Sequence, residues 1–179
     1  MAKGRAVSHF LTAAIACLAV ALFSLGPARA EELSPCDQFD WPIAKELGWF
    51  AARNLRTVES GARIDVNGAV AVKLRPYAEV AFAKPPERQP KTPESFGATI
   101  EVAAPDKAGL YQITLSDEAW IDVVQSGAFL KSVAFTGRKN CPGVRKSVRF
   151  DLGATPFTVQ ISGAPIDHLN LAISLAEDH

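Results

Sequence analysis

The sequence lacks the features that identify many enzymes and nucleic-acid-binding proteins. Basic and acidic residues are equal in number, 19 of each, so no net charge attracts nucleic acid or an anionic membrane. It contains neither a glycine-rich phosphate-binding loop nor a Gly-x-Ser-x-Gly nucleophile motif. We therefore expect no enzymatic activity, no cofactor and no nucleic-acid partner, and we assign no catalytic residue.

Histidine is also scarce, with three residues in the chain. Metal sites usually pair their ligands at short spacing, as in His-x-His or Cys-x-x-Cys, and neither pattern occurs. His168 is out of phase with the apolar residues that follow it and is predicted to face solvent or the second face of the sheet, and His179 is the last residue. Asp167 precedes His168, so a strand would point the two side chains to opposite sides, a poor geometry for a catalytic relay. We expect no metal site.

The N-terminal residues have the three zones of a signal peptide. Lys3 and Arg5 begin the chain, residues 10–25 are uncharged and mostly apolar, and Ala28–Ala30 matches the small-x-small cleavage pattern. The apolar run of about sixteen residues is shorter than the roughly twenty that span a bilayer. We predict that residues 1–30 are cleaved and that the domain is periplasmic or secreted, without a permanent membrane anchor. The alternatives are a retained anchor and a lipoprotein modified at Cys17.

Cleavage would leave two cysteines, Cys36 and Cys141. Disulfides persist in exported proteins, and two cysteines so far apart do not suggest a metal cluster. We predict a disulfide between them. On the chain-entropy account, closing a loop of about a hundred residues is worth roughly 4–5 kcal/mol.

One segment has helical spacing, and the rest has the period of strands. A short helix is predicted near residues 42–53, with Asp40 as the N-cap and Pro42 in the first turn. Beyond residue 62, apolar and polar residues alternate in about nine short segments separated by turn signals such as Asn67-Gly68 and Pro142-Gly143. These segments are 70–74, 80–82, 96–102, 111–115, 121–123, 133–135, 144–150, 157–161 and 169–175. The pattern predicts an all-β fold, an antiparallel, jelly-roll-like β-sandwich in one monomeric domain, residues 31–179.

Residues 84–93 interrupt this pattern. They include four prolines and no large apolar side chain, which is typical of an exposed, polyproline-like loop rather than a central strand. The loop is either a simple connection or a recognition segment for a protein partner.

The clearest compositional anomaly is a run of positive charge. From Val123 to Phe150 no acidic residue occurs, whereas six basic residues do: Lys131, Arg138, Lys139, Arg145, Lys146 and Arg149. Arg145 and Arg149 are predicted to share the solvent-facing side of a strand with Ser147. Arginine forks suit phosphate and sulfate groups, so the six residues are a candidate anion-binding surface. The alternative is a solvated face balanced by acidic residues of neighbouring strands.

Residues 96–173 resemble the bacterial pre-peptidase C-terminal domain, a small β-sandwich of secreted proteases. The resemblance rests on three segments, Gly109–Leu115, Trp120–Val124 with Gly127 and Leu130, and Phe157–Gly163. It implies a non-catalytic accessory or substrate-binding role. The acidic cluster that often binds calcium in that family corresponds only in part to Asp117, Glu118 and Asp122, so the sequence leaves calcium binding open.

From these features we expect a non-catalytic binding or accessory module of the cell envelope. Its ligand is expected to be an anionic polysaccharide, a lipid headgroup or an envelope protein. One alternative is a protein-directed inhibitor or assembly partner that acts through the proline-rich loop and exposed aromatic residues. A hydrolase that uses surface carboxylates is a third hypothesis.

Overall fold

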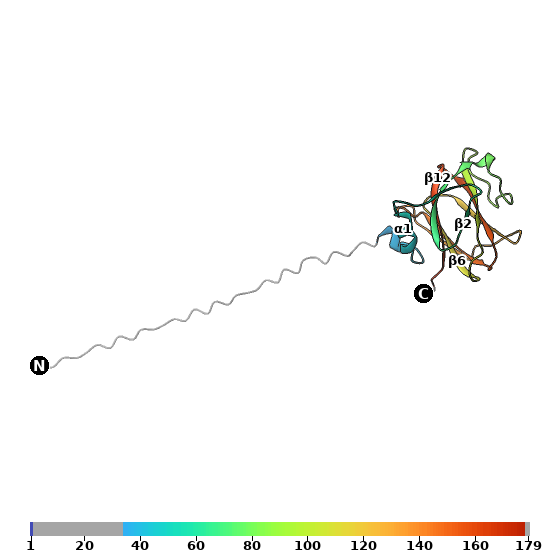
Figure 1. Ribbon diagram of the computed structural model, residues 1–179. Helices are drawn as coiled ribbons and strands as arrows, with labels where there is room; N and C mark the ends of the chain where they lie inside the picture. The colour runs from blue at the N-terminus through green and yellow to red at the C-terminus, as the bar shows by residue number, and fades with distance from the viewer. Residues whose placement is uncertain (2–33, 178–179) are drawn as a thin grey trace. The chain divides into compact units, whose positions relative to one another are not determined.

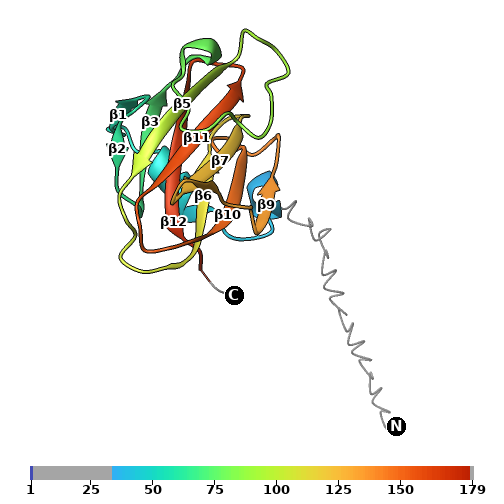
Figure 2. The ribbon, with the colours of Figure 1, turned by 90° about the vertical axis from the view of Figure 1, so that its right-hand side faces the viewer.

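The computed structural model describes Met1 and residues 34–177. Residues 34–177 fold as two β-sheets packed face to face (Figures 1 and 2). Sheet A has the order β1 (Thr57–Glu59), β3 (Gly68–Lys73), β12 (His168–Leu175), β6 (Gly109–Leu115), β10 (Lys146–Leu152), β9 (Ala134–Gly137). Sheet B has the order β2 (Arg63–Ile64), β5 (Phe96–Val102), β11 (Phe157–Ala164), β7 (Trp120–Gln125), β8 (Ala128–Phe129), and β4 (Arg75–Pro76) also pairs with β5. The predicted signal peptide and its cleavage site lie outside the described residues.

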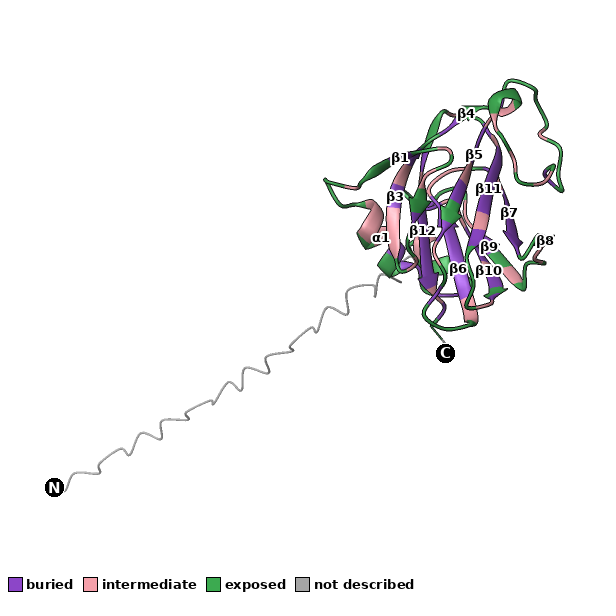
Figure 3. Ribbon diagram, turned by 45° about the vertical axis from the view of Figure 1, so that its right-hand side comes forward, coloured by how far each residue is buried: buried purple, intermediate pink, exposed green. Residues whose placement is uncertain are grey.

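The predicted all-β sandwich is confirmed. The long strands are largely buried (Figure 3). Their alternate side chains, among them Ile100, Ile113 and Leu171, point between the sheets and are fully buried. The long strands pair antiparallel, whereas the short edge strands β1 and β2 pair parallel with β3 and β5. One predicted strand was wrong. Residues 80–82 do not form a strand and instead follow directly after a 3-10 turn, η2 (Tyr77–Glu79). The Phe82 ring packs on Tyr77.

The helix is confirmed in place but is shorter than predicted. It is α1 (Ala44–Phe50), and Ile43 occupies the N-cap without a side-chain hydrogen bond, so Asp40 is not the cap. A second 3-10 turn, η1 (Pro35–Gln38), precedes it. Among the described residues, none of the helices has the length and apolar character needed to span a membrane.

The N-terminal segment, residues 36–50, covers the outer face of sheet A. Its buried side chains Phe39, Trp41 and Ile43 form a second apolar cluster with Cys141 and Val144. The Trp41 indole Nε1 donates to Ser147 Oγ at 3.2 Å, and Gln112 Nε2 donates to Glu46 Oε1 at 2.8 Å. This face of sheet A is therefore closed by both apolar packing and hydrogen bonds.

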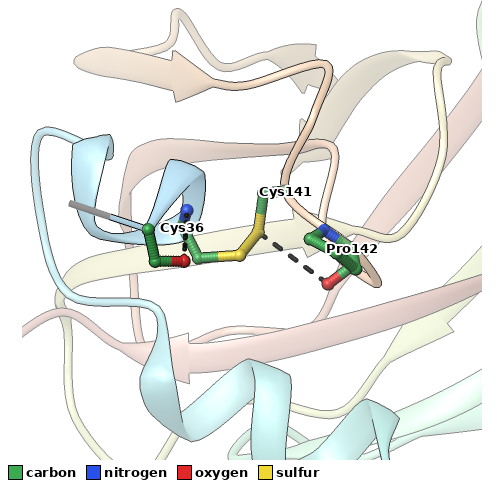
Figure 4. Close-up of a disulfide and its surroundings, with 4 residues drawn as sticks. Cys36, Cys141 and Pro142 are labelled. Carbon is green, nitrogen blue, oxygen red and sulfur yellow. Dashed lines mark hydrogen bonds between the residues drawn. A yellow bond between two sulfur atoms is a disulfide. The ribbon is translucent and has the colours of Figure 1, made fainter. Parts of the chain in front are cut away.

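The Cys36–Cys141 disulfide fastens this cover to the loop before β10 (Figure 4). The two Cα atoms are 4.8 Å apart, within the usual range for a disulfide, and the two residues are separated by 105 positions in the sequence. The predicted pairing is thus present in the structure.

The proline-rich loop is mostly exposed, as predicted, and it also covers part of the outer face of sheet B. The main chain of Lys84 exchanges two hydrogen bonds of 3.0 Å with the side-chain amide of Gln160, which is fully buried. The Glu87 N–H donates to Asp122 Oδ2 at 3.1 Å, and Pro86 is buried. Because buried amide and carboxylate groups of the sheet need partners, they hold the loop against it.

A close backbone contact makes Gly97 of β5 a sensitive position. A Cβ atom at Gly97 would lie 2.6 Å from the Ile161 carbonyl oxygen, where the register of β5 and β11 shifts. We expect Gly97→Ala to lower the free energy of unfolding by about 1–3 kcal/mol, because the backbone must move. The matched control is Gly68→Ala in β3, where nothing lies within 4 Å of the new Cβ, with an expected change within about 0.5 kcal/mol. Urea denaturation measures both, and equal effects would contradict the close contact.

Candidate functional site

The structure distributes the six predicted anion-binding cations over separate environments. Arg138 donates to the Gln38 carbonyl and lies 3.6 Å from Asp40 Oδ1, so it binds the N-terminal segment. Arg145 forms an ion pair with Glu118. Lys131 and Lys139 are exposed. The six residues therefore do not converge on one surface.

The expectation of a solvent-facing strand side for Arg145 and Arg149 was wrong. Ser147 on that side is fully buried, and the Arg149 guanidinium lies 4.3 Å from the Trp41 ring centroid. Arg149 also donates to Gln112 Oε1 at 3.4 Å, and Arg145 precedes the first residue of β10. Strand alternation correctly separated two faces, but the N-terminal segment covers the face that we took to be wet.

Lys146, by contrast, lines a cavity of about 450 Å³ beside the first residues of β7. Its apolar wall includes the core residues Ile121, Val148 and Phe150, which come from the inner faces of both sheets. Residues 87–92 of the proline-rich loop line another side. The cavity thus lies between core residues and the proline-rich loop, at the edge where β7 and β10 approach the ends of their sheets.

The unequal lengths of the edge strands leave an inner-face aromatic residue uncovered. Phe135 of β9 is the cross-strand partner of Val148, so it points to the inner side of sheet A. Across from it, sheet B ends in the two-residue strand β8. Phe135 is consequently 74% exposed although it occupies a core-facing position, and it lines the cavity.

Trp120 stands at the cavity with two cations beside its ring. The guanidinium of Arg88 and the ammonium of Lys146 lie 5.3 Å and 5.7 Å from the ring centroid, within the range of cation–π contacts. The indole Nε1 donates to Asp122 Oδ1 at 2.6 Å, which orients the ring. Burial is the main cause that raises the pKa of Asp122, while the hydrogen bonds from Trp120 and Glu87 act in the opposite direction.

The surroundings of Lys146 disfavour its positive charge. Burial is the first cause that lowers its pKa, and the positive charges of Arg145 and Arg88 lower it further, whereas Glu118 raises it. Its Nζ donates to the Ala119 carbonyl at 2.8 Å, a neutral partner. An anion bound beside Lys146 and Arg88 would offset both the burial and the repulsion between the cations.

Ser162 adds an unused polar group to the cavity wall. Its side chain is 1% exposed, and its Oγ has no hydrogen-bond partner among the described residues. A buried hydroxyl without a partner costs free energy, so this atom has hydrogen-bonding capacity for a ligand or a water molecule.

A smaller cavity of about 260 Å³ lies under α1. Glu46, Gln112, Arg149 and Ser174 line it, and Ser174 Oγ and Gln112 Nε2 both donate to Glu46 Oε1. These bonds connect the helix to sheet A.

The remaining polar groups to which the sequence pointed take part in separate contacts in the part of the chain that the structure describes. No group of three metal-ligating side chains occurs there. Of the acidic residues considered for calcium, Glu118 pairs with Arg145 and Asp122 accepts from Trp120. The expected separation of Asp167 and His168 was wrong, because Asp167 precedes β12 and its Oδ1 lies 2.8 Å from His168 Nδ1. His168 is exposed, which agrees with the first of its two predicted orientations.

The sequence drew attention to single residues of this site but did not show that they lie together. Lys146 belonged to the predicted basic surface, Arg88 to the proline-rich loop and Trp120 to a predicted strand. One local signal was available. Trp120 and Asp122 stand two apart on a strand, so their side chains share a face and can bond.

Comparisons with known proteins do not identify a family. No protein-family model matches the sequence, and no curated protein matches it. Among solved structures, a β-glucosidase from Paenibacillus barengoltzii is similar at 13% sequence identity over 67% of this chain, with a TM-score of 0.26. The matched region is 13% of the length of the glucosidase, and a likeness at this level carries no argument about fold or activity. The resemblance to the pre-peptidase C-terminal domain stays a prediction.

Proposed function

We propose that this protein is an exported, non-catalytic binding module of the cell envelope, and that it binds a ligand with an anionic group at the cavity beside Trp120. The observation that carries the proposal is the pair of cations, Arg88 and Lys146, next to one indole ring at a cavity of about 450 Å³. Ligand sites commonly combine an apolar cavity of this size with a few polar groups that converge on it.

The charges of the site favour an anion over a cation or a neutral ligand. Burial and neighbouring positive charge both disfavour the charged form of Lys146. Of the carboxylates at the cavity, Glu118 is paired with Arg145 and also raises the pKa of Lys146, and Asp122 accepts from both Trp120 and the Glu87 main chain. Glu87 lines the cavity as well, but none of the three carboxylates forms a salt bridge with Arg88 or Lys146 among the described residues. A phosphate, sulfate or carboxylate group would give Arg88 and Lys146 the acceptor that these carboxylates do not supply.

Three features support the cell envelope as the location. Residues 1–30 have the pattern of a cleaved signal peptide, and Cys36 and Cys141 are bonded as expected in an oxidising compartment. The resemblance to an accessory domain of secreted proteins agrees with a binding role without catalysis. Anionic polysaccharides and lipid headgroups are the ligands of this chemistry that an envelope contains.

A second candidate function is that of a protein-directed inhibitor or assembly partner. It is favoured by Val133 and Phe135, which are 55% and 74% exposed on or beside the edge strand β9. Exposed apolar side chains on a sheet edge are a common feature of protein interfaces. The proline-rich loop contributes less to this candidate than its sequence suggested, because its main chain is bound to Gln160 and Asp122.

The double variant Arg88→Gln with Lys146→Gln, which removes both positive charges, tests the proposal. Residues 31–179 are screened at low salt against sulfated and uronic-acid oligosaccharides and against phospholipid headgroups, with tryptophan fluorescence and calorimetry as readouts. We expect wild type to bind an anionic ligand with an affinity that falls steeply as salt rises. The variant should bind at least about tenfold more weakly, since it loses two charge-assisted contacts.

The matched control is Lys131→Gln with Lys139→Gln, which removes two exposed cations of the predicted surface. This control should bind like wild type. If both double variants lose affinity equally, binding depends on diffuse charge rather than on the site at Trp120. If wild type binds none of the anions, the proposed function is wrong and the protein-partner candidate takes its place.

A further inference from the structure

We infer that the ligand of this cavity is a single-chain anionic amphiphile, whose apolar chain lies between the two sheets and whose acidic head lies at Lys146 and Arg88. The inference rests on the proposed function and specifies its ligand class. The ligand is a detached amphiphile, such as a fatty acid, rather than a membrane surface.

The deep part of the cavity is continuous with the hydrophobic core. Ile121 of β7 and Val148 and Phe150 of β10 belong to the main core cluster, and Leu130 packs against it. A hydrophilic sugar ring placed against these side chains would leave its hydroxyl groups without hydrogen-bond partners, which is costly in an apolar site. An alkyl chain needs no such partners.

The alkyl chain of the ligand would cover Phe135, an inner-face residue that the facing sheet leaves exposed. In a β-sandwich, inner-face residues of one sheet are normally covered by the other sheet. Phe135 is on the inner face of β9, yet the short strand β8 leaves it 74% exposed. An alkyl chain in the cavity would contact the same inner face and supply the apolar partner that sheet B lacks there.

The polar groups at the cavity fit an acidic head. Lys146 and Arg88 lie beside the Trp120 ring and would bind a carboxylate, sulfate or phosphate through charge-assisted hydrogen bonds. Thus the apolar and the charged parts of one amphiphile match separate walls of one cavity.

The volume limits the length of the chain. A cavity of about 450 Å³ holds about fifteen water-sized groups of roughly 30 Å³ each. A carboxylate head with about ten to twelve carbons has this number of non-hydrogen atoms. Longer chains would extend into solvent at the open edge beside Phe135.

The test is a chain-length series of straight-chain carboxylates from four to sixteen carbons, each below its micelle concentration, titrated against residues 31–179. Burial of each methylene is expected to raise the affinity about fourfold up to about twelve carbons, with no further gain beyond that length. The twelve-carbon alcohol should bind at least about tenfold more weakly than the acid, because it lacks the charge.

Two variants test whether the alkyl chain of the ligand contacts Phe135. Phe135→Ala should lower the affinity for dodecanoate several-fold and leave that for butyrate unchanged. Its matched control is Val133→Ala, an exposed apolar residue beside the same strand that does not line the cavity. Because Phe135 is exposed, both variants are expected to fold.

Each failure has its own signature. If butyrate and dodecanoate bind equally, and both depend on Lys146 and Arg88, the amphiphile is wrong while anion binding stands. If phosphatidylglycerol vesicles bind but dodecanoate neither binds nor competes, the site recognises a membrane surface and the inference is overturned. If no anion of any length binds, both the inference and the proposed function fail.

Discussion

Replacing Cys36 with serine is expected to lower the free energy of unfolding by about 4–5 kcal/mol, less any strain that the disulfide adds to the folded state. The bond closes a loop with a sequence separation of 105 residues, which strongly restricts the unfolded chain. It also holds the N-terminal segment on sheet A, where Phe39, Trp41 and Ile43 are buried. The measurement is chemical denaturation of the protein recovered from the periplasm of a Gram-negative host, where we expect it to begin at Glu31.

The double variant Cys36→Ser with Cys141→Ser is the matched control, because it removes the bond without leaving a free thiol. It should lose as much stability as the single variant, and non-reducing peptide mapping of wild type should link the two cysteine-containing peptides. Two free thiols in wild-type material would contradict the disulfide. A loss in stability below about 1 kcal/mol would mean that the N-terminal segment docks equally well without it.

Replacing Trp41 with alanine is expected to lower the free energy of unfolding by about 3–5 kcal/mol, as is usual for a buried tryptophan. Trp41 is buried under the disulfide-linked segment, and its Nε1 donates to Ser147 Oγ. Ser147 Oγ also bonds Thr114 Oγ1 at 2.8 Å, so two further buried hydroxyls depend on this contact. The Arg149 guanidinium, 4.3 Å from the ring centroid, would lose its aromatic partner at the same time.

Trp49→Ala is the matched control, since Trp49 lies on the same segment but is only half-buried, with Lys45 Nζ 5.1 Å from its ring centroid. We expect a loss of about 1 kcal/mol or less from this change. The Trp41→Ala loss should shrink in the Cys36→Ser background, because both changes weaken the docking of one segment and neighbouring effects are not additive. Equal losses for the two tryptophans would show that the N-terminal segment does not cover sheet A in solution.

The strands and the buried polar residues show which features the local sequence pattern predicts and which depend on contacts between distant segments. Val70, Val72 and Leu74 alternate with less apolar residues, and the period of two alone predicts a strand with two unlike faces. It does not say what lies on the second face. Ser147 and Gln160 look like solvent-facing residues in the sequence, and both are buried because segments distant in the chain cover them.

The candidate site shows the same division. Arg88, Trp120 and Lys146 come from a loop and two strands of different sheets, so no spacing in the sequence relates them. The strand of Phe135 was predictable, but its exposure depends on how far the facing sheet extends, and β8 is too short to show in a periodic pattern.

The sequence alone therefore determined the all-β class, the short helix that precedes the strands, the cysteine pair and the absence of strand structure in residues 84–93. Each of these depends on local periodicity, on proline chemistry or on the number of cysteines left to pair. Only the tertiary structure decided which faces are covered, where the cations go and where the cavity opens. Those properties depend on contacts between residues far apart in the chain, which strand alternation leaves undetermined.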